Sequence, residues 1–148
     1  MTIPNASEPG AHPETEIDPT RLGHEYTTLP GYVAFWATRH ADAVYAAHQA
    51  KDALKGVRAR VWQRAHDERW GVYTAGMTKQ RPTEKLVESV TEQDPEVVEA
   101  QERLSVAQHE RDRIGAVLQA LEVKASMLIS LGADRRTELK HLEVRVNE

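Results

Sequence analysis

Apolar and small residues recur along residues 94–132 in steps that alternate between three and four, interrupted only at Arg111. This heptad spacing keeps one face of a helix against a partner. Asp94 can cap the first free backbone N–H groups, Pro95 suits the first helical position, and Gly132 suits the residue after a helix end. The pattern predicts a helix over 94–132 whose buried seam is Val97, Ala100, Leu104, Ala107, Ile114, Leu118, Leu121, Ala125 and Leu128.

A second apolar line runs beside this seam and widens the apolar face beyond what one partner helix covers. An exposed apolar stripe of this length usually marks an interface, and symmetric assembly is its common outcome. We therefore expect a homo-oligomer whose interface contains Val98, Val106, Val117, Met127 and Leu131.

A matching pattern predicts a helix over 32–70, with a seam at Val33, Trp36, His40, Ala43, Ala47, Ala50, Leu54, Val57 and Val61. Two helices of similar length favour an antiparallel hairpin over 32–132. Between them, Thr83 can cap a short helix over 83–93. The predicted class is all-α and coiled-coil-like. Within the two long helices, Gly56 and Gly115 mark either a hinge or tight crossing, or glycines that the helix merely tolerates.

The two ends of the chain differ from this pattern. Residues 1–30 hold five of the seven prolines and little apolar surface, so we expect residues 1–16 to be a disordered tail. Apolar residues return in 17–31, so this part either docks as an irregular arm or belongs to a plain tail. Residues 133–148 form a C-terminal helical tail in this interpretation, either as a separate helix or as a continuation of the long one.

Composition narrows the possible functions. The chain has no cysteine, which excludes disulfides and cysteine-ligated metals. It has neither a signal-peptide pattern nor an apolar run that approaches the roughly 18 residues of a membrane span. None of the seven histidines has a zinc-site spacing, and no phosphate-binding glycine motif is present. We expect a cytoplasmic protein with no membrane contact, no enzymatic activity, no catalytic residues, no metal and no cofactor.

Charge is distributed unevenly along the sequence. Residues 31–81 carry nine bases and four acids, whereas the segments on either side are acidic. Basic side chains can follow a phosphate backbone, and aromatic side chains interleaved with them can stack on unpaired bases. The alternative is a solvated basic face that pairs with an acidic helix, with the tryptophans in the core. The predicted nucleic-acid-binding residues are Lys51, Lys55, Arg58, Arg60, Trp62, Arg64, Arg69, Trp70, Lys79 and Arg81.

The order of short motifs resembles that of phage recombination mediators of the UvsY type. The resemblance covers about residues 17–136, and its pieces are IDPTRL and HEY within Ile17–Tyr26, WGVYTAGM at Trp70–Met77, PTEKLVESV, DPEVVEAQERL and KASMLISLGADRR.

This resemblance implies a small helical oligomer that binds single-stranded DNA and helps to load a recombinase onto strands covered by a single-strand-binding protein. It places the DNA contacts at Lys55, Arg58 and Arg60, and it implies a bacterial host cytoplasm for a phage-encoded protein. The alternative hypothesis is a structural coiled-coil assembly protein, such as a phage scaffold or adaptor, with no nucleic-acid role. The two differ in whether the basic and aromatic residues are exposed or are buried and neutralised.

Overall fold

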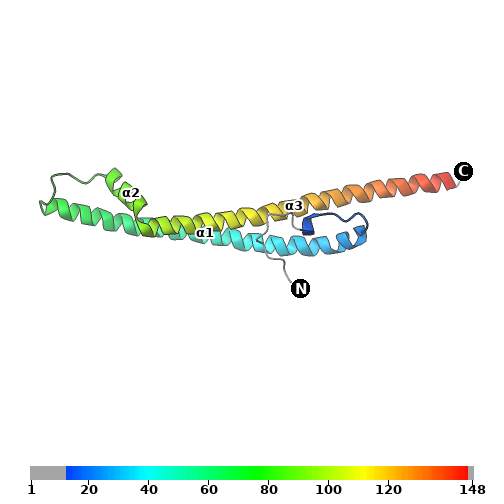
Figure 1. Ribbon diagram of the computed structural model, residues 1–148, viewed down its shortest axis with the longest axis horizontal. Coiled ribbons are helices and arrows are strands. Elements are labelled where there is room, and N and C mark those ends of the chain that lie inside the picture. The colour runs from blue at the N-terminus through cyan, green and yellow to red at the C-terminus, as the bar shows by residue number, and fades with distance from the viewer. Residues whose placement is uncertain (1–12, 147–148) are drawn as a thin grey trace. The chain divides into compact units, whose positions relative to one another are not determined.

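The computed structural model of the protein describes residues 13–146, and these residues form three α-helices and one short 3-10 helix (Figure 1). In chain order the elements are η1 (Pro13–Thr15), α1 (Leu22–Thr74), α2 (Glu84–Gln93) and α3 (Pro95–Val146). No strand occurs in this described part, which confirms the all-α class. The predictions for residues 1–12 and 147–148 fall outside it.

The chain divides into two compact units. The central unit is Ala41–Asp112, and the terminal unit combines Met1–His40 with Arg113–Glu148. Each unit therefore contains a part of α1 and a part of α3.

In the central unit, the predicted seams of α1 and α3 meet. Leu54 and Val61 pack with Val97 and Ala100 in one buried cluster, because their heptad spacing puts them on facing sides of the two helices. The helices run in opposite directions here, since Arg64 contacts Asp94 while Ala43 lines a shallow groove with Ala107.

The short helix α2 begins and ends through side-chain and backbone caps. Thr83 is its N-cap, and the Thr83 hydroxyl accepts a hydrogen bond from the Leu86 N–H at 3.3 Å. Val87 and Thr91 are its buried residues. Asp94 ends α2 with its own N–H bonded to the Thr91 carbonyl, and its carboxylate accepts the Glu96 N–H at 2.9 Å at the start of α3. The predicted caps at Thr83 and Asp94 are confirmed.

In the terminal unit, α1 begins at Leu22, whereas the sequence placed an irregular arm over 17–31 and the helix start at 32. The difference arises at Pro30, which lies inside α1. Proline lacks an N–H and disfavours a helix interior, but its ring is on an exposed side of α1 while Leu29 is buried. The apolar spacing thus continues back to Leu22, and packing maintains the helix through the proline.

The second difference is at Gly132, which the sequence assigned to a helix end. The helix α3 continues through it to Val146, so the predicted tail over 133–148 is a continuation of α3 as far as it is described. Gly132 serves packing instead. A Cβ at this position would lie 2.5 Å from the hydroxyl oxygen of Tyr26, and that hydroxyl donates a hydrogen bond to the Leu128 carbonyl.

Gly56 and Gly115, for which the sequence left open a tight crossing or a merely tolerated glycine, differ in their surroundings. A Cβ at Gly115 would lie 3.2 Å from Nε2 of His40, so this glycine allows a close approach of α1 and α3. A Cβ at Gly56 would meet nothing within 4 Å. Gly115 therefore marks a tight crossing in the terminal unit, and Gly56 is tolerated.

A buried ion pair joins α1 to α3 in the terminal unit. Lys124 is only 3% exposed, and its Nζ lies 2.5 Å from Oε2 of Glu25. Lys124 also donates to the backbone carbonyl of Glu14, whose carboxylate accepts the Trp36 indole N–H at 2.7 Å. Residues 13–16 were expected to belong to a disordered tail, but these contacts hold η1 against both helices.

Among the described residues, the part of α3 over Pro95–Arg145 is long and apolar enough to cross a membrane, judged by length and composition alone. Core helices of soluble proteins pass the same test, and this helix contains Lys124, whose charge is paired with Glu25.

Candidate nucleic-acid interface

The basic and aromatic residues of α1 in the central unit fall on different sides of the helix. Eight of these residues lie along one side of α1, because each is three or four positions away from another of the eight. We name this row the basic–aromatic stripe. It consists of Lys51, Lys55, Arg58, Trp62, His66, Arg69, Trp70 and Tyr73. Arg60 and Arg64 are out of step with it and lie on another side of α1.

The second half of the stripe is a row of ring contacts. The Trp62 and His66 rings stack with centroids 5.0 Å apart, His66 and Trp70 are 6.1 Å apart, and Trp70 meets Tyr73 edge to face at 5.6 Å. All four side chains are half-buried. The Arg81 guanidinium lies 5.6 Å from the centre of the Trp70 ring, a cation–π arrangement. Neither tryptophan is a core residue, in contrast to the alternative prediction.

His66 and Tyr73 were absent from the predicted site. The signal that identifies them is helical spacing, since His66 lies four residues after Trp62 and Tyr73 three after Trp70. The predicted site was defined by positively charged and aromatic residues along the sequence, and His66 was left out although it lies between two tryptophans.

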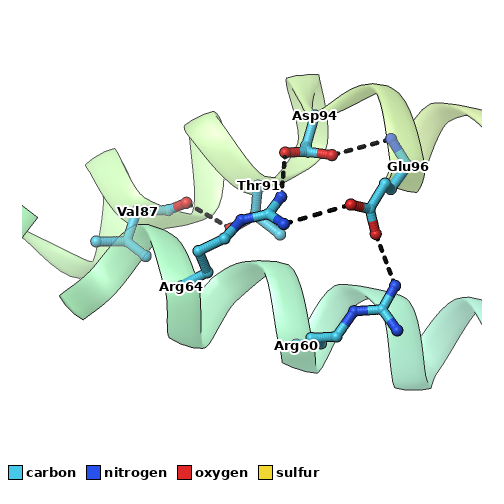
Figure 2. A network of polar contacts seen from close by, with 6 residues as sticks. All are labelled: Arg60, Arg64, Val87, Thr91, Asp94 and Glu96. Carbon is cyan, nitrogen blue, oxygen red and sulfur yellow. Dashed lines mark hydrogen bonds and ion pairs between the residues drawn. The ribbon is translucent and has the colours of Figure 1, made fainter. Parts of the chain in front are cut away.

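Arg60 and Arg64 are engaged by acids at the start of α3, as Figure 2 shows. Arg60 donates to Glu96 at 2.6 Å, while Arg64 bridges Asp94 at 2.9 Å and Glu96 at 3.3 Å. Hydrogen bonds from Arg60 and then Arg64 lower the pKa of Glu96, and the bond to Glu96 raises the pKa of Arg64. All of these side chains remain partly exposed, so the ion pairs exchange with solvent and salt.

Arg58 belongs to the stripe but also has an acidic partner. Its Nε lies 2.9 Å from Oε1 of Glu92 on α2. A shallow hollow beside Trp62 is lined by Arg58, Glu88 and Glu92 among others. Carboxylates at this point repel phosphate, so the middle of the stripe is its least favourable part for an anion.

The remaining predicted cations are exposed. Lys51 and Lys55 lie at one end of the stripe, and the nearest acid to Lys55 is Asp52, whose Oδ1 is 3.8 Å from Nζ. Arg69 is exposed on α1, and Lys79 and Arg81 are exposed on the segment that follows it. The structure thus places the predicted cluster as a stripe, a separate pair at Arg60 and Arg64, and two cations beyond α1.

The predicted oligomer-interface residues are mostly accessible. Val98 and Val106 in the central unit and Met127 and Leu131 in the terminal unit are exposed, with Val106 at 70%, whereas Val117 is half-buried. Exposed aliphatic side chains at these positions are compatible with an interface, but exposure alone does not identify the partner.

Within residues 13–146, no cluster of three or more histidine, aspartate and glutamate side chains is arranged to hold a metal ion. The central unit has ion pairs between helices at Arg58, Arg60 and Arg64, and ring contacts join Trp62 to Tyr73. No protein-family model, curated protein or solved structure matches the chain significantly.

Proposed function

We propose that the protein is a non-enzymatic, single-stranded DNA-binding recombination mediator. The observation that supports DNA binding is the basic–aromatic stripe, in which exposed lysines lead into half-exposed rings on one side of α1. The mediator role, with a recombinase and a single-strand-binding protein as partners in a bacterial host cytoplasm, rests on the resemblance to UvsY-type proteins.

The stripe suits an unpaired strand for two reasons. From Lys51 to Tyr73 it extends about 33 Å at 1.5 Å per residue, long enough for several nucleotides. Its lysines can neutralise phosphates, and its rings offer π-faces to bases without regard to sequence. A duplex buries its base faces by stacking, so the aromatic half favours single strands.

Self-association belongs to the same proposal. The opposite directions of α1 and α3 within each unit favour an antiparallel helical hairpin, and the exposed side chains of Val98, Val106, Met127 and Leu131 favour association of copies. The net charge of the chain is −4, which opposes DNA binding by a single copy. Several copies that present the same stripe along one strand bind multivalently.

The second candidate is a structural assembly protein without a nucleic-acid role. The observation that favours it is the neutralisation of Arg58, Arg60 and Arg64 by Glu92, Asp94 and Glu96. In this candidate, the arginines fix α2 and the start of α3 against α1. It predicts that the parent protein does not bind DNA even at low salt.

Two double variants with equal charge changes test the DNA site. Lys51→Ala/Lys55→Ala removes two stripe cations, and Arg60→Ala/Arg64→Ala removes two cations from another side of the same helix. Fluorescence anisotropy with a labelled oligothymidylate, at two salt concentrations, reports affinity and its salt dependence. We expect the lysine variant to bind more weakly and to lower the logarithmic salt slope by about 1.4, while the arginine variant keeps the parent slope.

The outcomes separate the candidates. Equal weakening in both variants means that binding follows overall charge and not the stripe. No binding by the parent at low salt contradicts the DNA proposal and leaves the assembly candidate. Trp62→Ala adds a test of stacking, with an expected loss of about 1–3 kcal/mol if a base stacks on this ring, and light scattering on each variant checks that its mass is unchanged.

A further inference from the structure

The last part of α3 extends beyond the region where α1 lies against it. Tyr26, near the start of α1, already contacts Leu128 and Gly132, and every residue from Ala133 to Arg145 is exposed. Most helical stability in proteins comes from the packing of an apolar face against a neighbour. A helical segment with two large leucines in solvent therefore gains stability from a partner.

The heptad seam continues through this segment. In the terminal unit, Leu121 and Leu128 are fully buried. The same alternation of four and three leads on to Leu139 and Leu142, which are 54% and 57% exposed. The seam that is buried earlier in α3 is thus presented to solvent in residues 133–145, with its spacing unchanged.

The charges beside this seam indicate what covers it. Arg136 and Glu143 border one side of the leucines, and Glu138 and Arg145 border the other. Residues at such bordering positions select partner and orientation in coiled coils. Consider two copies paired in antiparallel orientation, with Leu139 of one copy opposite Leu142 of the other. Arg136 of each copy then meets Glu143 of the other copy, and Glu138 of each copy meets Arg145 of the other copy. In a parallel pair, Glu138 of one copy meets Glu143 of the other.

We propose that residues 133–146 are a docking surface for the same segment of a second copy, in antiparallel orientation about a two-fold axis. The proposal does not depend on DNA binding. Arg135 occupies the seam position before Leu139. The apolar centre of the contact therefore consists of two leucines from each copy, and the contact is weak alone. It joins two copies through the last part of α3, whereas Val98, Val106 and Met127 lie on other sides of that helix.

Sedimentation velocity of the full chain over a range of concentrations measures this contact. Leu139→Asp/Leu142→Asp is expected to raise the dissociation constant at least tenfold. Val144→Asp is the matched control, because Val144 is equally exposed at 60% but lies off the seam, and it is expected to leave the constant unchanged. If the leucine variant changes stability but not mass, the segment is covered within its own chain and the proposal is overturned.

Orientation is tested by Glu143→Arg. In the antiparallel pair this change sets two guanidinium groups against each other at the contact with Arg136 and weakens association, and the double variant Arg136→Glu/Glu143→Arg restores it. In a parallel pair the same single change relieves the contact between Glu138 and Glu143 and tightens association. Tighter association of the Glu143→Arg variant, or a parent that stays monomeric at all concentrations, would overturn the proposal.

Discussion

Replacement of Gly132 by alanine tests the contact between Tyr26 and α3. Alanine in an unobstructed helix interior is more favourable than glycine by about 1 kcal/mol. At position 132, however, the new Cβ would lie 2.5 Å from the Tyr26 hydroxyl oxygen. That distance is too short for unbonded atoms, so the tyrosine must move and its hydrogen bond to the Leu128 carbonyl is lost.

The expected magnitude follows from these opposing effects. The helix gains about 1 kcal/mol from alanine, loses about 1 kcal/mol with the hydrogen bond, and loses roughly 1 kcal/mol more through overpacking. Gly132→Ala should therefore destabilise the protein by about 1 kcal/mol. In a Tyr26→Phe background the clashing oxygen is absent, and the nearest ring carbon is 3.6 Å from the Cβ position. There the same change should stabilise by about 1 kcal/mol.

The assay is a double-mutant cycle of four proteins, unfolded in urea and followed by circular dichroism at one fixed protein concentration, because self-association shifts apparent stability. Gly56→Ala is the control, since its Cβ meets nothing within 4 Å, and it should stabilise by about 1 kcal/mol. The expected coupling between positions 26 and 132 is about 2 kcal/mol. Equal stabilisation by Gly132→Ala in both backgrounds would refute the contact.

Three further predictions concern stability. Burial opposes the ionised form of Glu25, but hydrogen bonds from Lys124 and the Asp18 N–H, with the Lys124 charge, lower its pKa overall. The resulting stabilisation is present above the ordinary glutamate pKa of about 4.3 and is lost as pH falls through the lower pKa of the folded state. Urea unfolding between pH 6 and 3 should show this loss of stability, and the Glu25→Gln variant should show a weaker dependence of stability on pH. Gly115→Ala should gain less than Gly56→Ala in the same assay, because His40 must yield by a few tenths of an ångström; an equal gain would mean that the two helices are farther apart. Thr83→Ala removes the cap of α2 and should cost about 1 kcal/mol by thermal unfolding, whereas Thr83→Ser keeps a capping hydroxyl and serves as the control.

The helices could be predicted because their signal is local periodicity. Every predicted seam position of α1, from Val33 to Val61, is buried or half-buried, and the caps at Thr83 and Asp94 follow from residue type alone. The errors have a common origin. Pro30 and Gly132 were interpreted by their intrinsic preference, but in this fold tertiary contacts outweigh it, through the burial of Leu29 beside the proline and the Tyr26 hydroxyl against the glycine.

The candidate site was predicted less completely, because its composition is local but its geometry is not. Helical spacing alone separates Arg60 and Arg64 from the side that carries Lys55 and Trp62. Their pairing with Asp94 and Glu96 depends on how α3 starts relative to α1. That register is set by packing between residues that lie about thirty positions apart in the sequence. A sequence pattern contains no information of that kind.

Asp94 is a corner of a single residue, since α2 ends at Gln93 and α3 begins at Pro95. One residue added there would separate the two caps that Asp94 makes, to the Thr91 carbonyl and to the Glu96 N–H, and would displace Val87 and Thr91 from the core. The segment between Thr74 and Glu84 has no such constraint, because it connects α1 to α2 without a shared cap. Length variation among relatives of this chain should therefore accumulate before α2 and be absent after it, so the α2–α3 corner behaves as a fixed joint.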